Sequence, residues 1–315
     1  MKKFLLLFVV WGIGLCVLAF VAETMITSKL RKSPERMYAP WNEIYSGNLH
    51  YDGIIMGSSR AWRHYDPAIL ESILKMNFYN MGIDGSQINR QVIKYNTFCR
   101  LNAKPKVIIH NIDLWLASLS YGYEREQFFP YFSDKTFLKE ISCEEPFNWL
   151  EKYLPAYRYM GYPKQVTAGL GMTLFSDEVR LTKGYYGREE LWDGTELRKL
   201  DGIDFHQDSI ALRMFDRYLS EVKKDNIKLI FVYAPIYIEA TKKIRNVEKM
   251  YQMFDNIARK YDIPLLDYSY APMSYDTTYF YDANHLNKKG AEFFSAKLAH
   301  DIDSLGILNK VMREK

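Results

Sequence analysis

Short apolar runs alternate with longer amphipathic segments along most of this chain. The runs with strand length lie at 53–56, 77–80, 107–109, 229–233 and 264–267. Segments with helical spacing lie at 67–74, 87–101, 209–224, 239–260 and 288–301. Strands that are apolar throughout and alternate with helices predict an α/β fold, here a doubly wound parallel five-stranded sheet of flavodoxin-like type. In such sheets the ligand lies at the carboxyl ends of the strands.

The alternation stops between 114 and 205, where aromatic residues, glycine and proline are frequent. We interpret this stretch as an insertion on the sheet domain, with amphipathic helices within 146–162. Its aromatic residues could line a groove for a glycan or an acyl chain, but their helical spacing is more typical of a core. The residues concerned are Trp115, Trp149, Tyr153 and Tyr157.

The N-terminus carries an unbroken apolar run from Phe4 to Ala22, which is long enough to span a bilayer. Phe20 occupies a position that signal peptidase requires to be small, so the sequence favours an uncleaved anchor over a cleaved signal peptide. We therefore divide the chain into an anchor (1–26), a polar linker (27–50) and an α/β domain (51–310).

The orientation of the anchor is inferred from its position in the chain. Basic residues after the span oppose a simple positive-inside reading; they are Lys29, Arg31, Lys32 and Arg36. A single N-terminal span before a large domain usually leads to export of that domain. We therefore predict that the domain lies outside the cytoplasm, on the periplasmic or extracellular face.

Charge and cysteine content exclude several classes of function. The net charge is +4, and Lys2 and Lys3 supply two of these charges, so the chain lacks the basic tract that nucleic-acid binding needs. Of the three cysteines, Cys16 lies in the span, and Cys99 lies in a predicted helix, which favours a buried thiol over a disulfide with Cys143. No cysteine–histidine cluster has zinc-ligand spacing, and neither a metal nor a cofactor is predicted.

Candidate chemistry begins with Gly57-Ser58-Ser59, directly after the first strand. A serine between the end of a strand and a helix is well placed for nucleophilic attack, and nearby backbone N–H groups can bind an oxyanion. Asp66 is expected to cap the helix that begins at Pro67. The turn alone is weak evidence, since glycine and serine are ordinary turn residues.

The second candidate stretch is Asp282-Ala283-Asn284-His285, which precedes the last helix. A nucleophilic serine needs a base such as histidine, and the histidine needs a partner that fixes its tautomer. Asp282 can serve His285 from the same loop, and Asn287 is expected to cap the last helix. An isolated Asp-x-x-His is also compatible with a solvated loop without function.

Three motifs in order carry a family resemblance: Gly57-Ser58-Ser59, Asn80-x-Gly82-x-x-Gly85 and Asp282-x-x-His285-Leu286. This order resembles the SGNH (GDSL-like) hydrolase superfamily of esterases and acyltransferases. It is most similar to membrane-anchored envelope members of the D-alanyl-transfer type, which also carry Gly-Ser-Ser in place of Gly-Asp-Ser. The resemblance covers about 52–113 and 209–301, and leaves out the anchor and the insertion.

The resemblance implies a role for each matched residue. Ser59 would be the nucleophile, with Ser58 as its competitor, His285 the base and Asp282 the carboxylate that orients it. The backbone N–H groups of Ser59 and Gly85 would form the oxyanion hole. We interpret Gly82 as a turn residue with positive φ.

The sequence departs from the family after the third strand. The family usually has a Gly-x-Asn-Asp turn that supplies a side-chain oxyanion donor, whereas residues 109–114 contain no glycine. Asn111 is the candidate replacement, and the alternative is an asparagine that satisfies local backbone at the end of the strand. Arg60 could replace the donor, bind an anionic substrate together with Ser58, or form only a surface salt bridge.

The resemblance implies a serine esterase or O-acyltransferase with a Ser-His-Asp triad. Its substrate would be an acetyl or D-alanyl ester of a cell-envelope polysaccharide or polymer. The implied partners are the membrane, the acylated polymer and a membrane protein that donates the acyl group. The alternative is a non-catalytic envelope scaffold or glycan-binding protein with the same fold.

Overall fold

The computed structural model describes residues 1–119, 121–172, 181–195, 197, 202–309 and 311. The chain divides into two compact units, and each is formed by two separate stretches of sequence. One unit comprises Met1–Ser46 with Tyr121–Arg180, and the other comprises Gly47–Ser120 with Leu181–Lys315.

The second unit is built on a parallel sheet with strand order β2-β1-β3-β4-β5. Its strands are β1 (Gly53–Met56), β2 (Phe78–Asn80), β3 (Val107–Asn111), β4 (Lys228–Tyr233) and β5 (Leu265–Asp267). Gly53 at the start of β1 pairs with Phe78 on one side and Val107 on the other. This order is that of flavodoxin-like doubly wound sheets and confirms the predicted fold class.

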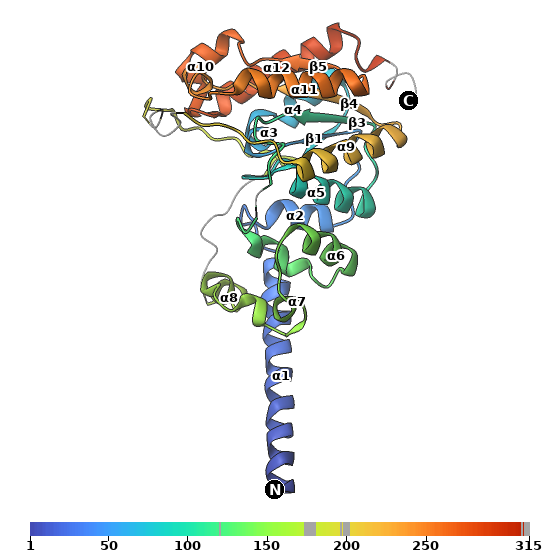
Figure 1. Ribbon diagram of the computed structural model, residues 1–315, viewed down its shortest axis with the longest axis vertical. Coiled ribbons are helices and arrows are strands. Elements are labelled where there is room, and N and C mark those ends of the chain that lie inside the picture. The colour runs from blue at the N-terminus through green and yellow to red at the C-terminus, as the bar shows by residue number, and fades with distance from the viewer. Residues whose placement is uncertain (120, 173–180, 196, 198–201, 310, 312–315) are drawn as a thin grey trace. The chain divides into compact units, whose positions relative to one another are not determined.

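Helices cover both faces of this sheet, and its interior strands β1, β3 and β4 are buried almost throughout. One face packs against α3 (Ser59–His64), α4 (Pro67–Leu74) and α12 (Lys288–Ser304), through a core that includes Ile55, Ile109 and Phe294. The other packs against α5 (Ile88–Leu101), α9 (Ser209–Lys224) and α11 (Val247–Tyr261), where the Phe215 ring contacts Phe231 and Phe254. Helices α5 and α9 lie side by side along this face (Figure 1).

Short elements complete the unit near its C-terminus. They are α10 (Ile238–Thr241), η4 (Pro272–Tyr275), η5 (Thr277–Tyr279), β6 (Phe280–Asp282) and β7 (His285–Leu286). The two predicted caps are present: Asp66 accepts from the N–H of Ala68, and Asn287 accepts from the N–H of Gly290.

One predicted helix, 239–260, is wrong as a continuous element. Helix α10 ends at Thr241 and α11 begins at Val247. Between them the N–H of Arg245 donates to the carbonyl of Ile203, in a bridge to a distant segment, instead of to its own helix. Tertiary pairing therefore overrides a helical pattern that the local sequence supports.

The first unit is helical. It contains α1 (Lys2–Leu30), α2 (Ala39–Tyr45), η1 (Arg125–Tyr131), α6 (Lys135–Glu144), α7 (Trp149–Tyr153), η2 (Tyr157–Tyr159) and α8 (Pro163–Gly169). Trp41 of α2 is only 1% exposed and packs edge-on against Phe128 and Phe137, while its Nε1–H donates to Gln127. The predicted linker at 27–50 therefore includes a helix that belongs to a core.

The predicted insertion at 114–205 is wider than the segment that leaves the sheet unit. Residues at both of its ends belong to that unit: the Tyr186 ring lies 5.0 Å from Trp62, and the N–H of Trp192 donates to Phe280. The core interpretation of the insertion aromatics is wrong for Trp149 and Tyr153, which are 67% and 59% exposed.

Helix α1 begins with Lys2 and Lys3 and is apolar after them, with a mean hydropathy of 2.8 over a stretch of which none is buried. A helix of this length and composition can cross a membrane, as an anchor or as a signal sequence.

The prediction that Gly82 is a turn residue with positive φ is wrong. Its φ is not positive. Instead, a Cβ atom at this position would lie 2.2 Å from the backbone nitrogen of Trp62, at the start of the loop after β2. The residue is glycine because the loop runs directly against the backbone of α3, where no side chain fits.

We expect Gly82→Ala to lower the free energy of unfolding by roughly 3 kcal/mol, because backbone must move to admit the methyl group. Chemical denaturation in detergent measures this value. The matched control is Gly194→Ala, which has φ +78° but nothing within 4 Å of an added Cβ. It should cost about 1 kcal/mol. Equal losses in the two variants would contradict the steric explanation.

Candidate active site

The turn between β1 and α3 places Ser59. Strand β1 ends at Met56, Gly57 and Ser58 turn the chain, and Ser59 is the first residue of α3. Gly57 has φ +143°, which favours glycine, and an added Cβ would lie 2.7 Å from that of Ala61. Ser59 thus lies at the carboxyl end of a central strand, where doubly wound sheets hold their ligands.

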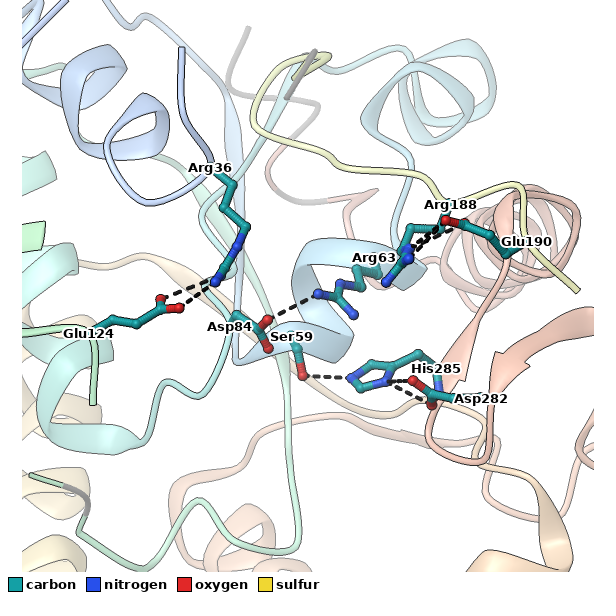
Figure 2. Close-up of polar contacts among 9 residues, drawn as sticks. All are labelled: Arg36, Ser59, Arg63, Asp84, Glu124, Arg188, Glu190, Asp282 and His285. Atoms are coloured by element: carbon teal, nitrogen blue, oxygen red, sulfur yellow. Dashed lines mark hydrogen bonds and ion pairs between the residues drawn. The ribbon is translucent and has the colours of Figure 1, made fainter. Parts of the chain in front are cut away.

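The Ser59 hydroxyl lies 2.8 Å from Nε2 of His285, although the two residues are 226 positions apart. Nδ1 of His285 lies 2.9 Å from each carboxylate oxygen of Asp282 (Figure 2). A carboxylate only accepts hydrogen bonds, so Nδ1–H donates to Asp282 and Nε2 is left to accept from the Ser59 hydroxyl. The structure therefore brings together the three residues that the sequence singled out as nucleophile, base and orienting carboxylate.

The β6–β7 hairpin explains why Asp282 and His285 meet. Asp282 ends β6 and His285 begins β7. One carboxylate oxygen of Asp282 accepts the backbone N–H groups of Asn284 and His285, at 2.8 and 2.9 Å. The same side chain therefore closes the turn and holds the imidazole. Because Asp282 and His285 are only three positions apart, local structure is enough to bring them together.

The electrostatics keep Asp282 ionised. Burial acts to raise the pKa of Asp282, but the hydrogen bonds and charge of His285 and the backbone N–H groups outweigh it, so the pKa lies below its usual value. A carboxylate in this state can stabilise an imidazolium next to it.

A second histidine joins the hairpin to α3. The N–H of Leu286 donates to Nε2 of His64, the last residue of α3, at 3.0 Å. His64 is fully buried; burial lowers its pKa well below the usual value, and the neighbouring cationic side chains act in the same direction. His64 is therefore neutral and can accept this bond. It links the helix that carries Ser59 to the strand that carries His285.

The loop after β2 brings Gly85 to the same edge of the sheet. The N–H of Ile83 donates to the carbonyl of Gly57, and Gly85 has φ +61°. Within the described residues, the N–H groups of Ser59 and Gly85 make no hydrogen bond. They are the backbone donors that an oxyanion hole on this turn would use.

The structure contradicts the prediction that Asn111 donates to an oxyanion. Its side chain is fully buried, accepts from the hydroxyl of Tyr65 at 2.8 Å and donates to Asp113 at 2.9 Å. The alternative, that this asparagine satisfies local structure, describes it better.

Arg60 is also placed differently from the prediction. It is 2% exposed, and its Nε lies 2.5 Å from a carboxylate oxygen of Asp113, with the guanidinium over the Trp115 ring. It is thus neither a surface salt bridge nor a contact for substrate. The prediction failed because the sequence does not show that the side chain after Ser59 points into the protein.

Asp113 connects the turn before Ser59 to β3. Besides Arg60 and Asn111, it accepts the backbone N–H of Ser58 at 3.2 Å, and it is fully buried. The hydroxyl of Ser58 is itself buried and without a partner in the described part of the chain. This position contradicts a substrate-binding role for Ser58 and leaves Ser59 as the serine that faces His285.

Sequence reasoning missed the residues that surround the imidazole. The Tyr281 ring is parallel to the His285 ring, with 5.4 Å between their centres. The guanidinium groups of Arg63 and Arg188 lie 5.3 and 4.7 Å from the centre of the Tyr281 ring. Arg63 pairs with Asp84 at 3.0 Å (Figure 2). One signal was available: Arg63 follows Ser59 by four positions, which is the same side of a helix.

Across the described residues, no three histidine, cysteine, aspartate or glutamate side chains gather in a way that could hold a metal ion.

The sequence matches no family model and no curated protein. Among solved structures, the fold is similar to that of a protein from Desulfitobacterium hafniense DCB-2 that is provisionally assigned to the G-D-S-L family of lipolytic proteins. The identity is 10%, the match covers 79% of this chain and 98% of that one, and the TM-score is 0.40. A likeness of this size carries no argument about activity, so the chemical argument depends on the site geometry.

We expect Asp113→Asn to destabilise the protein by about 3–5 kcal/mol, because it leaves the Arg60 guanidinium buried without a counter-charge. Denaturant unfolding measures the loss. Asp225→Asn is the matched control, since Asp225 pairs with Lys104 at an exposed site. That change should cost less than about 1 kcal/mol. A loss at Asp113 no larger than at Asp225 would contradict the role of the buried pair.

His110 generates a prediction about acid stability. It is fully buried on β3, where Nε2 lies 2.9 Å from the side-chain oxygen of Gln91, and burial lowers its pKa to about 4. An unfolded histidine has a pKa of about 6.5 and takes up a proton that the folded one does not. Stability should therefore fall as pH falls from about 6.5 to 4, by up to about 1.4 kcal/mol per unit.

Unfolding free energies measured across that pH range test this expectation. His110→Gln removes the titrating group and should give a shallower slope than the wild type. Part of the slope should remain, because the buried His64 acts with the same sign. Identical slopes for the two proteins would show that His110 is not responsible.

Proposed function

We propose that this chain is a membrane-anchored serine esterase or O-acyltransferase of the SGNH type. The observation that carries the proposal is the continuous hydrogen-bonded series from the Ser59 hydroxyl through His285 to Asp282. Each member has the neighbour that nucleophilic acyl chemistry requires, and the nucleophile lies at the ligand-binding edge of the sheet.

In the first half of the reaction, the Ser59 oxygen attacks the carbonyl carbon of an ester, and His285 takes the hydroxyl proton. The imidazolium that forms is stabilised by the ionised Asp282. The N–H groups of Ser59 and Gly85 donate to the oxyanion of the tetrahedral intermediate. The intermediate collapses, the bond to the alcohol oxygen breaks, and His285 returns the proton to the departing alcohol. The acyl group is then an ester of Ser59.

In the second half, His285 takes a proton from the acceptor hydroxyl, which attacks the acyl-enzyme. Water as acceptor makes the protein an esterase, and a sugar or polymer hydroxyl makes it a transferase. Ser59 leaves with its proton restored from His285. No atom changes its oxidation state, so the cycle needs neither an oxidant nor a reductant.

We infer the cellular location of the proposed enzyme from α1. An anchored site stays close to acylated polymers and acyl donors at the envelope, and a single N-terminal span exports the domain. The substrates we propose are acetyl or D-alanyl esters of an envelope polysaccharide or polymer, with a membrane acyl-donor protein as the partner of a transferase.

One observation favours a second candidate, a non-catalytic scaffold or glycan-binding protein with this fold. Asn111, the residue that would replace the family's side-chain oxyanion donor, is committed to Tyr65 and Asp113. Loss of one such donor typically costs on the order of 10² to 10³ in rate.

The test is labelling by a fluorophosphonate probe, together with turnover of a small acetyl ester by the full-length protein in detergent. We expect the wild type to react, and Ser59→Ala, His285→Ala and Asp282→Asn to lose activity by on the order of 10³ or more. Ser58→Ala should keep the labelling. A wild type that is neither labelled nor active would support the scaffold, and labelling that survives Ser59→Ala would refute this nucleophile.

A further inference from the structure

A group of exposed apolar side chains lies on and just after α7. We call it the α7 surface, and it consists of Trp149, Leu150, Tyr153, Leu154 and Met160. The exposed fractions are 67% for Trp149, 59% for Tyr153 and 71% for Met160, and the two leucines are each 38% exposed. The rings of Trp149 and Tyr153 lie 5.8 Å apart. Side chains of this kind gathered on one surface usually mark an interaction site.

The polarity of α7 is reversed with respect to a helix that faces water. Its acidic residue, Glu151, is only 12% exposed and pairs with Arg125 of the same unit at 3.1 Å. Glu151 also closes a capping box with Asn148, which fixes the first turn of the helix. The ion pair of Glu151 with Arg125 is therefore held against the protein, while the rings of Trp149 and Tyr153 are exposed.

Contacts with α1 fix the position of the α7 surface along the axis of that helix. Glu23 of α1 pairs with Arg158 at 2.8 Å, and its carboxylate accepts the N–H of Ala156, two residues after Leu154. The hydroxyls of Thr27 and Tyr159 are 2.9 Å apart. Figure 1 shows α7 and α8 beside α1, within this one unit.

This level coincides with the end of the apolar span. The large side chains of α1 are exposed from Phe4 to Val21, and the first acidic residue, Glu23, is the one that holds Arg158. In membrane proteins, tryptophan and tyrosine gather where an apolar span meets water, because their rings are apolar and their N–H or O–H groups are polar. The α7 surface has this composition at this place.

We propose that the α7 surface rests in the interfacial layer of the bilayer that α1 crosses. The occupant of the surface is thus lipid at the headgroup level, and the membrane contacts the protein at a second site beside the span. The inference rests on α1 crossing a bilayer and is independent of the proposed chemistry at Ser59. A second contact restrains the tilt and rotation of the unit, which a single helix does not do.

The native cysteines offer reference positions for the test. Cys16 lies in the apolar span of α1, and Cys143 is exposed on α6 of the same unit. Full-length variants that carry one cysteine each, with the others changed to serine, are labelled with an environment-sensitive fluorophore and placed in phosphatidylcholine vesicles. The test positions are Leu150→Cys and Met160→Cys, which leave Trp149 and Tyr153 in place. Quenching is then measured with nitroxide lipids labelled at the headgroup or deep in the acyl chain.

We expect both test positions to be quenched several-fold more strongly by the headgroup nitroxide than Cys143 is, and less by the deep nitroxide than Cys16 is. Changing Trp149 and Tyr153 to glutamate should lower the quenching at Leu150→Cys and leave that at Cys16 unchanged. Quenching at both test positions no stronger than at Cys143 would overturn the proposal and assign the surface to a protein partner or a second copy. Strong quenching at Cys16 in the same experiment shows that α1 is inserted. Weak quenching at the two test positions would then not result from a failure of α1 to insert.

Discussion

The arrangement of the site depends on one buried carboxylate, that of Asp113. A fully buried charge is stable only when its acceptor positions are used, and this one is shared by a backbone amide, a guanidinium and a side-chain amide. These donors come from the turn before Ser59, from α3 and from the end of β3. The turn can therefore not shift without breaking the hydrogen bond from the Ser58 N–H to this buried carboxylate.

Much of the sheet unit could be predicted from the sequence because its information is local. Strand β1 and helices α4 and α9 have the predicted bounds, since each has apolar positions with a clear period and residues that stop it. The pairing of Asp282 with His285 was predictable for the same reason, because three residues of sequence determine it. The long-range distance from Ser59 to His285 was not predictable in this way, since the fold sets it by placing their elements at one sheet edge.

The failures share a physical cause, which is that burial is a tertiary property. Arg60 and Asn111 have side chains suited to a substrate, and the sequence does not show that Asp113 withdraws them from solvent. Trp149 and Tyr153 show the opposite error: aromatic residues at helical spacing usually form a core, but these two are exposed. Whether such residues face inward depends on the partner against which their own helix packs, and that partner is distant in the sequence.

The β6–β7 hairpin has a consequence for how such a protein can change. Asp282 and His285 form one local module near the C-terminus, and Ser59 belongs to the turn after the first strand. The chain between them supplies none of these three side chains. The segment 121–180 leaves the sheet unit and returns to it within that interval. It can therefore lengthen, shorten or be exchanged for another peripheral domain while the reacting groups keep their spacing. The arrangement of Ser59, His285 and Asp282 can in this way be combined with different peripheral domains, because the segment 121–180 supplies none of these residues.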